Sequence, residues 1–480
     1  MSALQHETIP AIAPERFASV LSRGEYEALL DLIDQAARQL HGQVIWNVNS
    51  TAKGGGVVEM LRPLLGYCRG AGVDARWAVI SGQPDFFAIT KRIHNRLHGF
   101  AGDGGPLGDA EREVYERTLT ASADELAKLV HPEDIVILHD PQTAGLAAAV
   151  RLTGATVMWR CHVGLDVAND HARDAWEFLR GYVSDAHLFI FSRAGYAWDG
   201  LPRDRTSVIR PSIDAFAPKN AEQSREQSLA IMATAGILAH DVNAYPMFTR
   251  SDGTPGRVER QAEMLEEEPL VADVPVVVQV SRWDQLKDPV GVLGAFAGHV
   301  GRRGEAHLML VGPSTAAVAD DPEGAQVLDE VRSAWHDLPG AMRRRVHLCS
   351  LPMEDIEENA AIVNALQRHA SVVVQKSLAE GFGLTVAEAM WKQRPVVASR
   401  IGGIRDQIEH GRSGVLLSDP RDLEQAGAAV RELLADGDRA RHLGIAAQQR
   451  VQQQFLGPHH LGRYFEVIHR VAAQRRVGAG

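Results

Sequence analysis

The sequence predicts an α/β protein made of two doubly wound domains, each with a parallel sheet. Short apolar, β-branched runs alternate with segments of helical periodicity, and a long polar stretch after residue 210 interrupts this alternation once. The length of 480 residues suits two large domains better than one. We expect an N-terminal domain over residues 1–215 and a C-terminal domain over 216–455, facing each other across a cleft.

The first domain begins with an expected strand over 44–49, a glycine turn over 53–56 and a helix with one apolar face. A second strand over 75–80 completes a βαβ unit. The same rhythm predicts strands at 134–138, 156–159, 187–191 and 206–209, a helix over 143–152, and Ser192 as the N-cap of a helix.

The second domain repeats the pattern after a stretch over 215–275 that shows no clear strand and has no role we can assign. After Pro420 the sequence becomes helical, and a C-terminal helix over about 456–480 is expected to pack back on the first domain. The strands expected in the second domain are 276–280, 307–311, 345–348, 372–375, 396–399 and 414–416.

Charge and cysteine content exclude several classes of protein. The chain has 50 Lys and Arg against 61 Asp and Glu, a net charge of −11, which argues against nucleic acid and membrane surfaces as partners. Its three cysteines form neither a disulfide framework nor a CxxC metal motif. With no apolar leader or membrane span in the sequence, we expect a cytoplasmic protein.

Ligands of parallel sheets bind beyond the carboxyl ends of the strands, so the loops there matter most. One such loop holds Gly54, Gly55 and Gly56, whose backbone amides can approach an anion or a sugar. It matches neither GxGxxG nor the P-loop pattern, which leaves NAD and P-loop nucleotides unsupported. An ordinary βα turn explains the glycines equally well.

Two loops in the second half carry charge. Arg282 and Lys287 follow the strand 276–280 and can neutralise a diphosphate, although a solvated surface pair is the alternative. Glu380 and Glu388 have seven residues between them, which form a Gly-Phe-Gly loop and the start of a helix. These carboxylates can accept hydrogen bonds from sugar hydroxyls, or one of them can simply cap the helix.

Two polar residues follow strands of the first half. His162 comes after the strand 156–159 and can donate a hydrogen bond to a hydroxyl or to developing charge, whereas a structural histidine is the alternative. Asp140 comes after the strand 134–138 and can orient a hydroxyl. A cap for the helix expected near Thr143 is an equal explanation.

Together, the Arg282–Lys287 segment, the Glu380–Glu388 element and the turn over 402–406 resemble retaining glycosyltransferases of the GT-B fold, in the large family that includes sucrose and trehalose synthases. The strings VNSTAKGGGVVEML, WRCHVGLD and PSIDAFAPKN more narrowly resemble trehalose glycosyltransferring synthases and the related trehalose phosphorylases. This resemblance covers about residues 43 to 420. It implies a GT-B fold with an N-terminal acceptor domain and a C-terminal nucleotide-sugar donor domain.

The resemblance also implies roles for individual residues. Arg282 and Lys287 would hold the donor diphosphate, Glu388 the ribose, and Glu380 the transferred glucose. No metal is implied, and Asp436-Gly437-Asp438 is interpreted as a turn. The implied catalytic residues are His162, Arg282, Lys287 and Glu380; the donor-binding residues are Gly55, Gly56, Gly312, Gly381, Phe382, Gly383, Leu384 and Glu388; the acceptor-binding residues are Asn49, Lys53, Gly54, Asp140 and Gln142.

The implied activity is transfer of glucose from an NDP-glucose to glucose or a related sugar, with retention, giving trehalose or a similar α,α-linked disaccharide. The nucleotide sugar is a substrate, and no cofactor is expected. Two alternatives stay open, a trehalose phosphorylase that uses glucose 1-phosphate and a non-catalytic sugar-nucleotide-binding protein. Small molecules are the expected partners, and a homodimer is left open.

Overall fold

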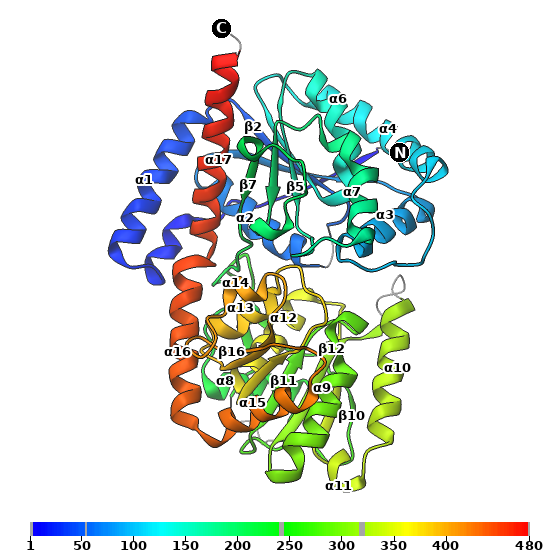
Figure 1. The fold of residues 1–480 in the computed structure, drawn as a ribbon. Helices are drawn as coiled ribbons and strands as arrows, with labels where there is room; N and C mark the ends of the chain where they lie inside the picture. The colour runs from blue at the N-terminus through cyan, green and yellow to red at the C-terminus, as the bar shows by residue number, and fades with distance from the viewer. Residues whose placement is uncertain (1–2, 53–54, 240–243, 316–321, 479–480) are drawn as a thin grey trace. The chain divides into compact units, whose positions relative to one another are not determined.

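The computed structural model describes residues 3–52, 55–239, 244–315 and 322–478. The chain divides into two compact units, each an α/β body (Figure 1). Unit 1 comprises the chain up to Ser212 together with the segment from Phe455 onward, and unit 2 comprises Ile213–Gln454. The sequence placed the boundary near residue 215 and the start of the returning helix near 456.

Unit 1 contains a seven-stranded sheet in the order β1-β3-β2-β4-β5-β6-β7. Strands β2 to β7 are parallel, as the sequence predicts. The apolar residues of the central strands β4, β5 and β6 are buried on both faces, as is usual in a parallel sheet. Strand β1 pairs antiparallel with β3 at the edge and was not predicted, since three of its four residues are polar and it has no apolar run. The strands are β1 (Leu4–Glu7), β2 (Val44–Asn49), β3 (Asp74–Ile80), β4 (Ile135–His139), β5 (Thr156–Cys161), β6 (Leu188–Phe191) and β7 (Thr206–Val208).

The helices of unit 1 form two groups (Figure 1). One group contains α3, α4, α6 and α7, which pack on one another, and the other contains α1, α2 and α17. The first group covers an aromatic core that includes Trp46, Tyr115 and Trp159. The bounds are α1 (Arg23–Gln39), α2 (Gly56–Gly70), α3 (Pro84–Leu97), α4 (Asp109–Leu129), α5 (Asp140–Thr143), α6 (Ala147–Leu152), α7 (Asp170–Val183) and α17 (Gly457–Gly478).

Two local predictions for unit 1 are corrected. The helix expected over 143–152 is divided into α5, a 3-10 turn over 144–146 and α6. Ser192 caps no helix, because the one-turn 3-10 helix that follows begins at Ala194. The Ser192 hydroxyl instead donates to the carbonyl of His162 at 3.4 Å, which ties together the loops after β5 and β6.

Unit 2 contains a second seven-stranded sheet in the order β10-β13-β12-β11-β14-β15-β16, parallel except for β10. All six predicted parallel strands are present. The strands are β10 (Glu263–Leu265), β11 (Val276–Val280), β12 (His307–Pro313), β13 (Val346–Leu351), β14 (Val372–Gln375), β15 (Val396–Ser399) and β16 (Val415–Leu417).

The stretch 215–275 is not free of strands, so that expectation is wrong. It contains helix α8 (Arg225–Thr234), the hairpin of β8 (Met247–Thr249) and β9 (Pro255–Arg257), and the edge strand β10. Each strand is three residues long, too short for an alternating pattern to show. The acidic run at 266–268, which follows β10, pairs with His347, Arg343 and Arg344.

Helix α8 packs against α12, and α13 packs against α16. Among the helices of the described residues, none combines the length and apolarity that a membrane crossing requires. The remaining helices of unit 2 are α9 (Pro289–Ala295), α10 (Pro322–His336), α11 (Gly340–Arg343), α12 (Ile356–His369), α13 (Leu384–Trp391), α14 (Ile404–Gln407), α15 (Leu423–Ala435) and α16 (Gly437–Gln454).

Candidate active site

In unit 2 the loop between β14 and α13 is shaped by glycines. Gly383 is the N-cap of α13 and has a φ of 83°, a left-handed conformation that favours glycine. The loop is held from outside, since the Gly403 amide donates to the Gly381 carbonyl at 3.0 Å and the Gln407 amide group donates to the carbonyls of Phe382 and Gly383. The result is a fixed helix N-terminus, which favours an anionic ligand.

Lys287 and Glu380, predicted from separate motifs, meet in the structure. The Lys287 Nζ lies 2.6 Å from the Glu380 Oε2, and the side chains are only 16% and 10% exposed. The Ser377 hydroxyl donates to the same oxygen at 3.3 Å. A backbone hydrogen bond from Leu378 to Leu286, at 2.7 Å, joins the two loops. A cation and a carboxylate are therefore held together at the carboxyl edge of the sheet.

Arg282 lies apart from this pair. Its guanidinium contacts Asp284 at 3.1 Å, and its side chain is 58% exposed. Gly312 has a packing role, because a Cβ there would lie 2.4 Å from the ring of Trp283, whose indole donates to the Pro313 carbonyl. Lys287 is thus the more buried cation of this loop, and Arg282 is the more exposed one.

Glu388 lies in the middle of α13 and is buried. Its Oε1 is 3.8 Å from the Nζ of Lys219, a residue of the PSIDAFAPKN string that the sequence analysis did not select. Leu384 opens the helix, and Phe382 is buried in the loop before it. The sequence could not predict this contact, because Lys219 and Glu388 are far apart along the chain.

In unit 1 a buried chain of polar groups spans three strands. The Asn47 Oδ1 lies 3.0 Å from the His139 Nε2, and the His139 Nδ1 lies 3.0 Å from the His162 Nε2. With Asn47 accepting, His139 carries its proton on Nε2 and accepts from the Nε2–H of His162. Burial, followed by the nearby Arg160 charge, lowers the pKa of both histidines well below its ordinary value. Both rings are therefore neutral near pH 7.

Asp140 follows His139 with a φ of 63°, which is uncommon for a residue with a side chain. Its Oδ1 accepts from the His162 amide at 2.7 Å, and its carbonyl accepts from the Trp159 indole at 3.0 Å. The carboxylate caps no helix, since α5 begins at Asp140 itself. Burial raises the pKa of Asp140 to about 7.

The other predicted residues of unit 1 have varied environments. The Asn49 Oδ1 accepts from the Trp77 indole at 2.8 Å inside the core, and Gln142 is half-buried on α5. Gly55 is the N-cap of α2 with a φ of 82°, and Gly56 is the first residue of that helix. Lys53 and Gly54 lie outside the described residues.

Arg160 was not selected from the sequence, yet it is fully buried beside this chain of polar groups on β5. Its guanidinium contacts His460 at 2.9 Å, the Tyr464 hydroxyl, and the Ile209 carbonyl at 3.3 Å. Helix α17 is therefore bonded to the strand that ends just before His162.

Both carboxylates of the Asp436-Gly437-Asp438 motif contact residues close to them in the sequence. The Asp436 carboxylate accepts from the Arg439 amide at 2.9 Å, and Asp438 pairs with Arg441 at 3.0 Å. In the parts of the chain that the structure describes, no three His, Cys, Asp or Glu side chains gather as metal ligands would.

Each unit has a mainly parallel sheet with polar loops at its carboxyl edge, and two such units are the architecture of the GT-B fold. The fold is similar to the α,α-trehalose-phosphate synthase (UDP-forming) of Burkholderia xenovorans, with a TM-score of 0.66, 14% identity, and coverage of 88% of this chain and 99% of that one. The family profile described as "Trehalose synthase, N-terminal domain" matches residues 47–198, and that of "Glycosyl transferases group 1" matches 356–450.

Relatives in sequence identify the family within the glycosyltransferases. The trehalose synthase of Rubrobacter xylanophilus is 33% identical over 450 residues, which cover 92% of this chain and 93% of that protein. The trehalose phosphorylase of Pleurotus pulmonarius is 23% identical over 92% of this chain but only 58% of its own length. The chain belongs to the trehalose synthase family of glycosyltransferases.

Proposed function

We propose that the protein transfers glucose from an NDP-glucose to glucose or a related sugar, with retention, forming trehalose or a similar α,α-linked disaccharide. The observation that carries this proposal is the Lys287–Glu380 contact beside the glycine-capped start of α13. It puts a cation, a carboxylate and a helix N-terminus at one loop. A sugar diphosphate has the matching groups, an anionic bridge and a hydroxylated ring.

On the donor side, the departing diphosphate gains negative charge as the glycosidic bond breaks. Lys287 and the α13 amides stabilise that charge from fixed positions, and Arg282 adds an exposed guanidinium. When the diphosphate binds Lys287, Glu380 can accept hydrogen bonds from glucose hydroxyls. Glu388 accepts from the ribose.

On the acceptor side, the hydrogen-bond chain refines the role of His162. Because its Nε2–H is donated to His139, the Nδ1 is an acceptor, so His162 receives a hydrogen bond from a sugar hydroxyl. A neutral ring suits an uncharged ligand. No carboxylate is assigned as a covalent nucleophile, and the leaving phosphate takes the proton of the attacking hydroxyl on the same face, which retains the anomeric configuration.

A product assay tests the proposal. The purified protein is incubated with glucose and UDP-, ADP- or GDP-glucose, each in its own tube, and the products are read by NMR. The proposal predicts an α,α-linked disaccharide with at least one nucleotide donor. If hydrolysis or no reaction is seen with all of them, the proposed transfer is wrong.

Trehalose phosphorylase is a second candidate, favoured by the similarity to the Pleurotus enzyme. A single phosphate can bind the cation that a diphosphate would bind. A parallel tube with glucose and glucose 1-phosphate distinguishes the two, because a disaccharide formed only there would assign the phosphorylase reaction.

We also propose that the reaction needs no resident metal or cofactor, that its partners are small molecules, and that it runs in the cytoplasm. The helix N-terminus and Lys287 supply the positive charge that a divalent cation would otherwise provide at a diphosphate.

A further inference from the structure

A buried lysine lies at the far end of helix α13 from the glycine loop. Lys392 is 3% exposed, and its Nζ contacts three neutral oxygens. These are the Gln367 Oε1 at 2.8 Å, the Asn220 Oδ1 at 3.1 Å and the Glu388 carbonyl at 3.1 Å. An ammonium group has three N–H donors, so this arrangement satisfies each of them.

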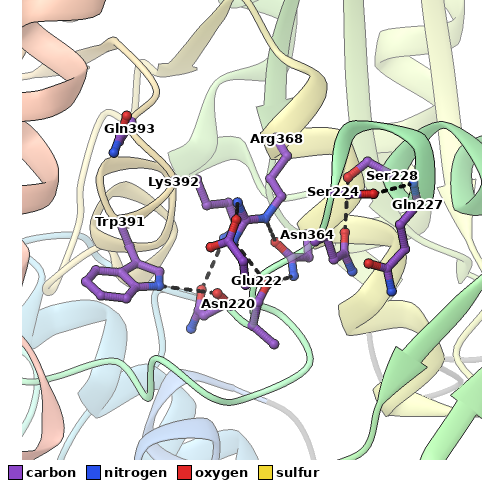
Figure 2. A network of polar contacts seen from close by, with 12 residues as sticks. Asn220, Glu222, Ser224, Gln227, Ser228, Asn364, Arg368, Trp391, Lys392 and Gln393 are labelled. Atoms are coloured by element: carbon purple, nitrogen blue, oxygen red, sulfur yellow. Dashed lines mark hydrogen bonds and ion pairs between the residues drawn. The ribbon is translucent and has the colours of Figure 1, made fainter. Parts of the chain in front are cut away.

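Asn220 belongs to a segment over 217–222 that crosses α12 and α13. Its carbonyl accepts from the Trp391 indole at 3.2 Å. Asn364 of α12 donates to the carbonyls of Pro218 and Ala221, at 3.0 and 2.8 Å. The contacts of Lys392, Trp391 and Asn364 meet around Asn220 (Figure 2) and fix this segment on the two helices.

Lys219 directly precedes Asn220, and its Nζ lies 3.8 Å from the Glu388 Oε1. Lys392 therefore holds both sides of that contact, the segment through Asn220 and the helix through the Glu388 carbonyl. Arg368 of α12 also approaches the segment and pairs with Glu222 at 3.2 Å.

We propose that Lys392 is a positioning residue of the nucleotide site: through Asn220 and the Glu388 carbonyl it keeps Lys219 against the Glu388 carboxylate that receives the ribose. This inference rests on the proposed function, which assigns the ribose to Glu388. Lys392 itself does not touch the ligand.

The environment of Lys392 predicts that nucleotide affinity depends on pH. The pKa of Lys392 is lowered to about 7, chiefly by burial and also by Arg368, Lys219 and Arg394, while Glu388 opposes the shift. A neutral amine has two N–H donors for three oxygens, so deprotonation removes one of the contacts. Nucleoside diphosphate affinity is therefore expected to fall as the pH rises from 6 to 9.

Titration calorimetry of the full chain with UDP, ADP and GDP tests this, with inorganic pyrophosphate as a probe that has no ribose. Lys392→Met is expected to weaken binding of the preferred nucleotide about tenfold at pH 6.5 and to leave pyrophosphate binding unchanged. Lys128→Met, which changes an exposed lysine of α4, is the matched control and should bind like the parent.

Gln367→Glu is the second variant, because it gives the buried ammonium a carboxylate partner of nearly the same shape. It should raise the pKa of Lys392 and move the loss of nucleotide affinity to a pH higher by about one unit or more. A purely structural role predicts no such shift. Comparing each variant with the parent at every pH removes the titration of the ligand's own phosphate.

The outcomes separate the two proposals. Equal nucleotide affinity of Lys392→Met and the parent would overturn the positioning role while the proposed function stands. An unshifted pH profile in a folded Gln367→Glu variant would overturn it as well. If the parent binds no nucleotide better than pyrophosphate, the ribose assignment of the proposed function fails, and the inference fails with it.

Discussion

The candidate sites of the two units use different chemistry. In unit 2 the site is charged, with Lys287 paired to Glu380 beside a helix N-terminus. In unit 1 it is a buried, neutral chain from Asn47 through His139 to His162. Fixed charge suits an anionic diphosphate, whereas neutral groups suit an uncharged sugar. Under the proposed function, unit 2 would bind the nucleotide sugar and unit 1 the acceptor sugar.

The largest effect is expected when the cation of unit 2 is removed. Lys287→Ala should lower kcat/KM by an amount equivalent to about 3 to 4 kcal/mol of transition-state stabilisation, because it removes the cation that would neutralise the leaving diphosphate and that pairs with Glu380. Steady-state kinetics with the best nucleotide donor measure this. Near-normal turnover in a folded variant would contradict the proposal that Lys287 neutralises the leaving diphosphate.

A somewhat smaller loss is expected in unit 1. His162→Ala should lower kcat/KM by an amount equivalent to about 2 to 3 kcal/mol of transition-state stabilisation. It removes the proposed contact to the sugar and the hydrogen bond donated to His139. Because burial keeps the pKa of His162 well below its ordinary value, the parent's rate should show no step from this ring between pH 6 and 8. A pH–rate profile with such a step, absent from a His162→Gln variant, would show that the ring is charged.

Arg282→Ala sharpens the comparison inside unit 2. The guanidinium is 58% exposed, so its contribution should be smaller than that of Lys287, about 1 to 2 kcal/mol, and more sensitive to salt. Parallel kinetics at low and high ionic strength measure both features. An Arg282 effect larger than the Lys287 effect would reverse the ranking that burial suggests.

Asp140 allows a test by stability alone. Its pKa is raised from 3.8 to about 7 in the folded protein, so the folded state binds more protons than the unfolded state between those values. Stability from this group is present at low pH and is lost as the pH rises toward 7. Asp140→Asn, which keeps the acceptor oxygen for the His162 amide, should therefore gain stability relative to the parent between pH 5 and 8. Thermal melts at several pH values measure the difference, and parallel melting curves would contradict it.

The smallest effect is expected from chelation. Since the positive charge of the proposed donor site comes from the chain, dialysis against EDTA should leave the rate of transfer unchanged. An activity lost in EDTA and restored by a divalent cation would show that the account of unit 2 lacks a component.

The parallel strands of both units were predictable because each is an apolar, β-branched run between turns. Strands β1, β8, β9 and β10 were not, since their short sequences lack an apolar, β-branched run and the fold alone supplies their partners. Lys287 and Glu380 were predictable from local motifs on loops after strands. Their contact was a consequence of the strand order, which puts β11 next to β14.

The polar chain of unit 1 was only partly predictable. His162 was selected for its place after a strand, but its partners Asn47 and His139 depend on β2, β4 and β5 being neighbours. Asn49 shows the opposite case, because a polar residue at the end of a strand suggests a ligand, while the Trp77 indole on β3 already occupies its Oδ1. Lys219 and Lys392 were not predictable, because their contacts depend on how the segment 217–222 packs on α12 and α13.

The most direct test of the division between the units is a set of binding measurements. Nucleoside diphosphate binding by calorimetry and glucose binding by ligand-observed NMR are compared in the parent, Lys287→Ala and His162→Ala proteins. The account predicts that Lys287→Ala loses nucleotide binding and keeps glucose binding, and that His162→Ala does the reverse. Loss of nucleotide binding in His162→Ala, with Lys287→Ala unaffected, would contradict it.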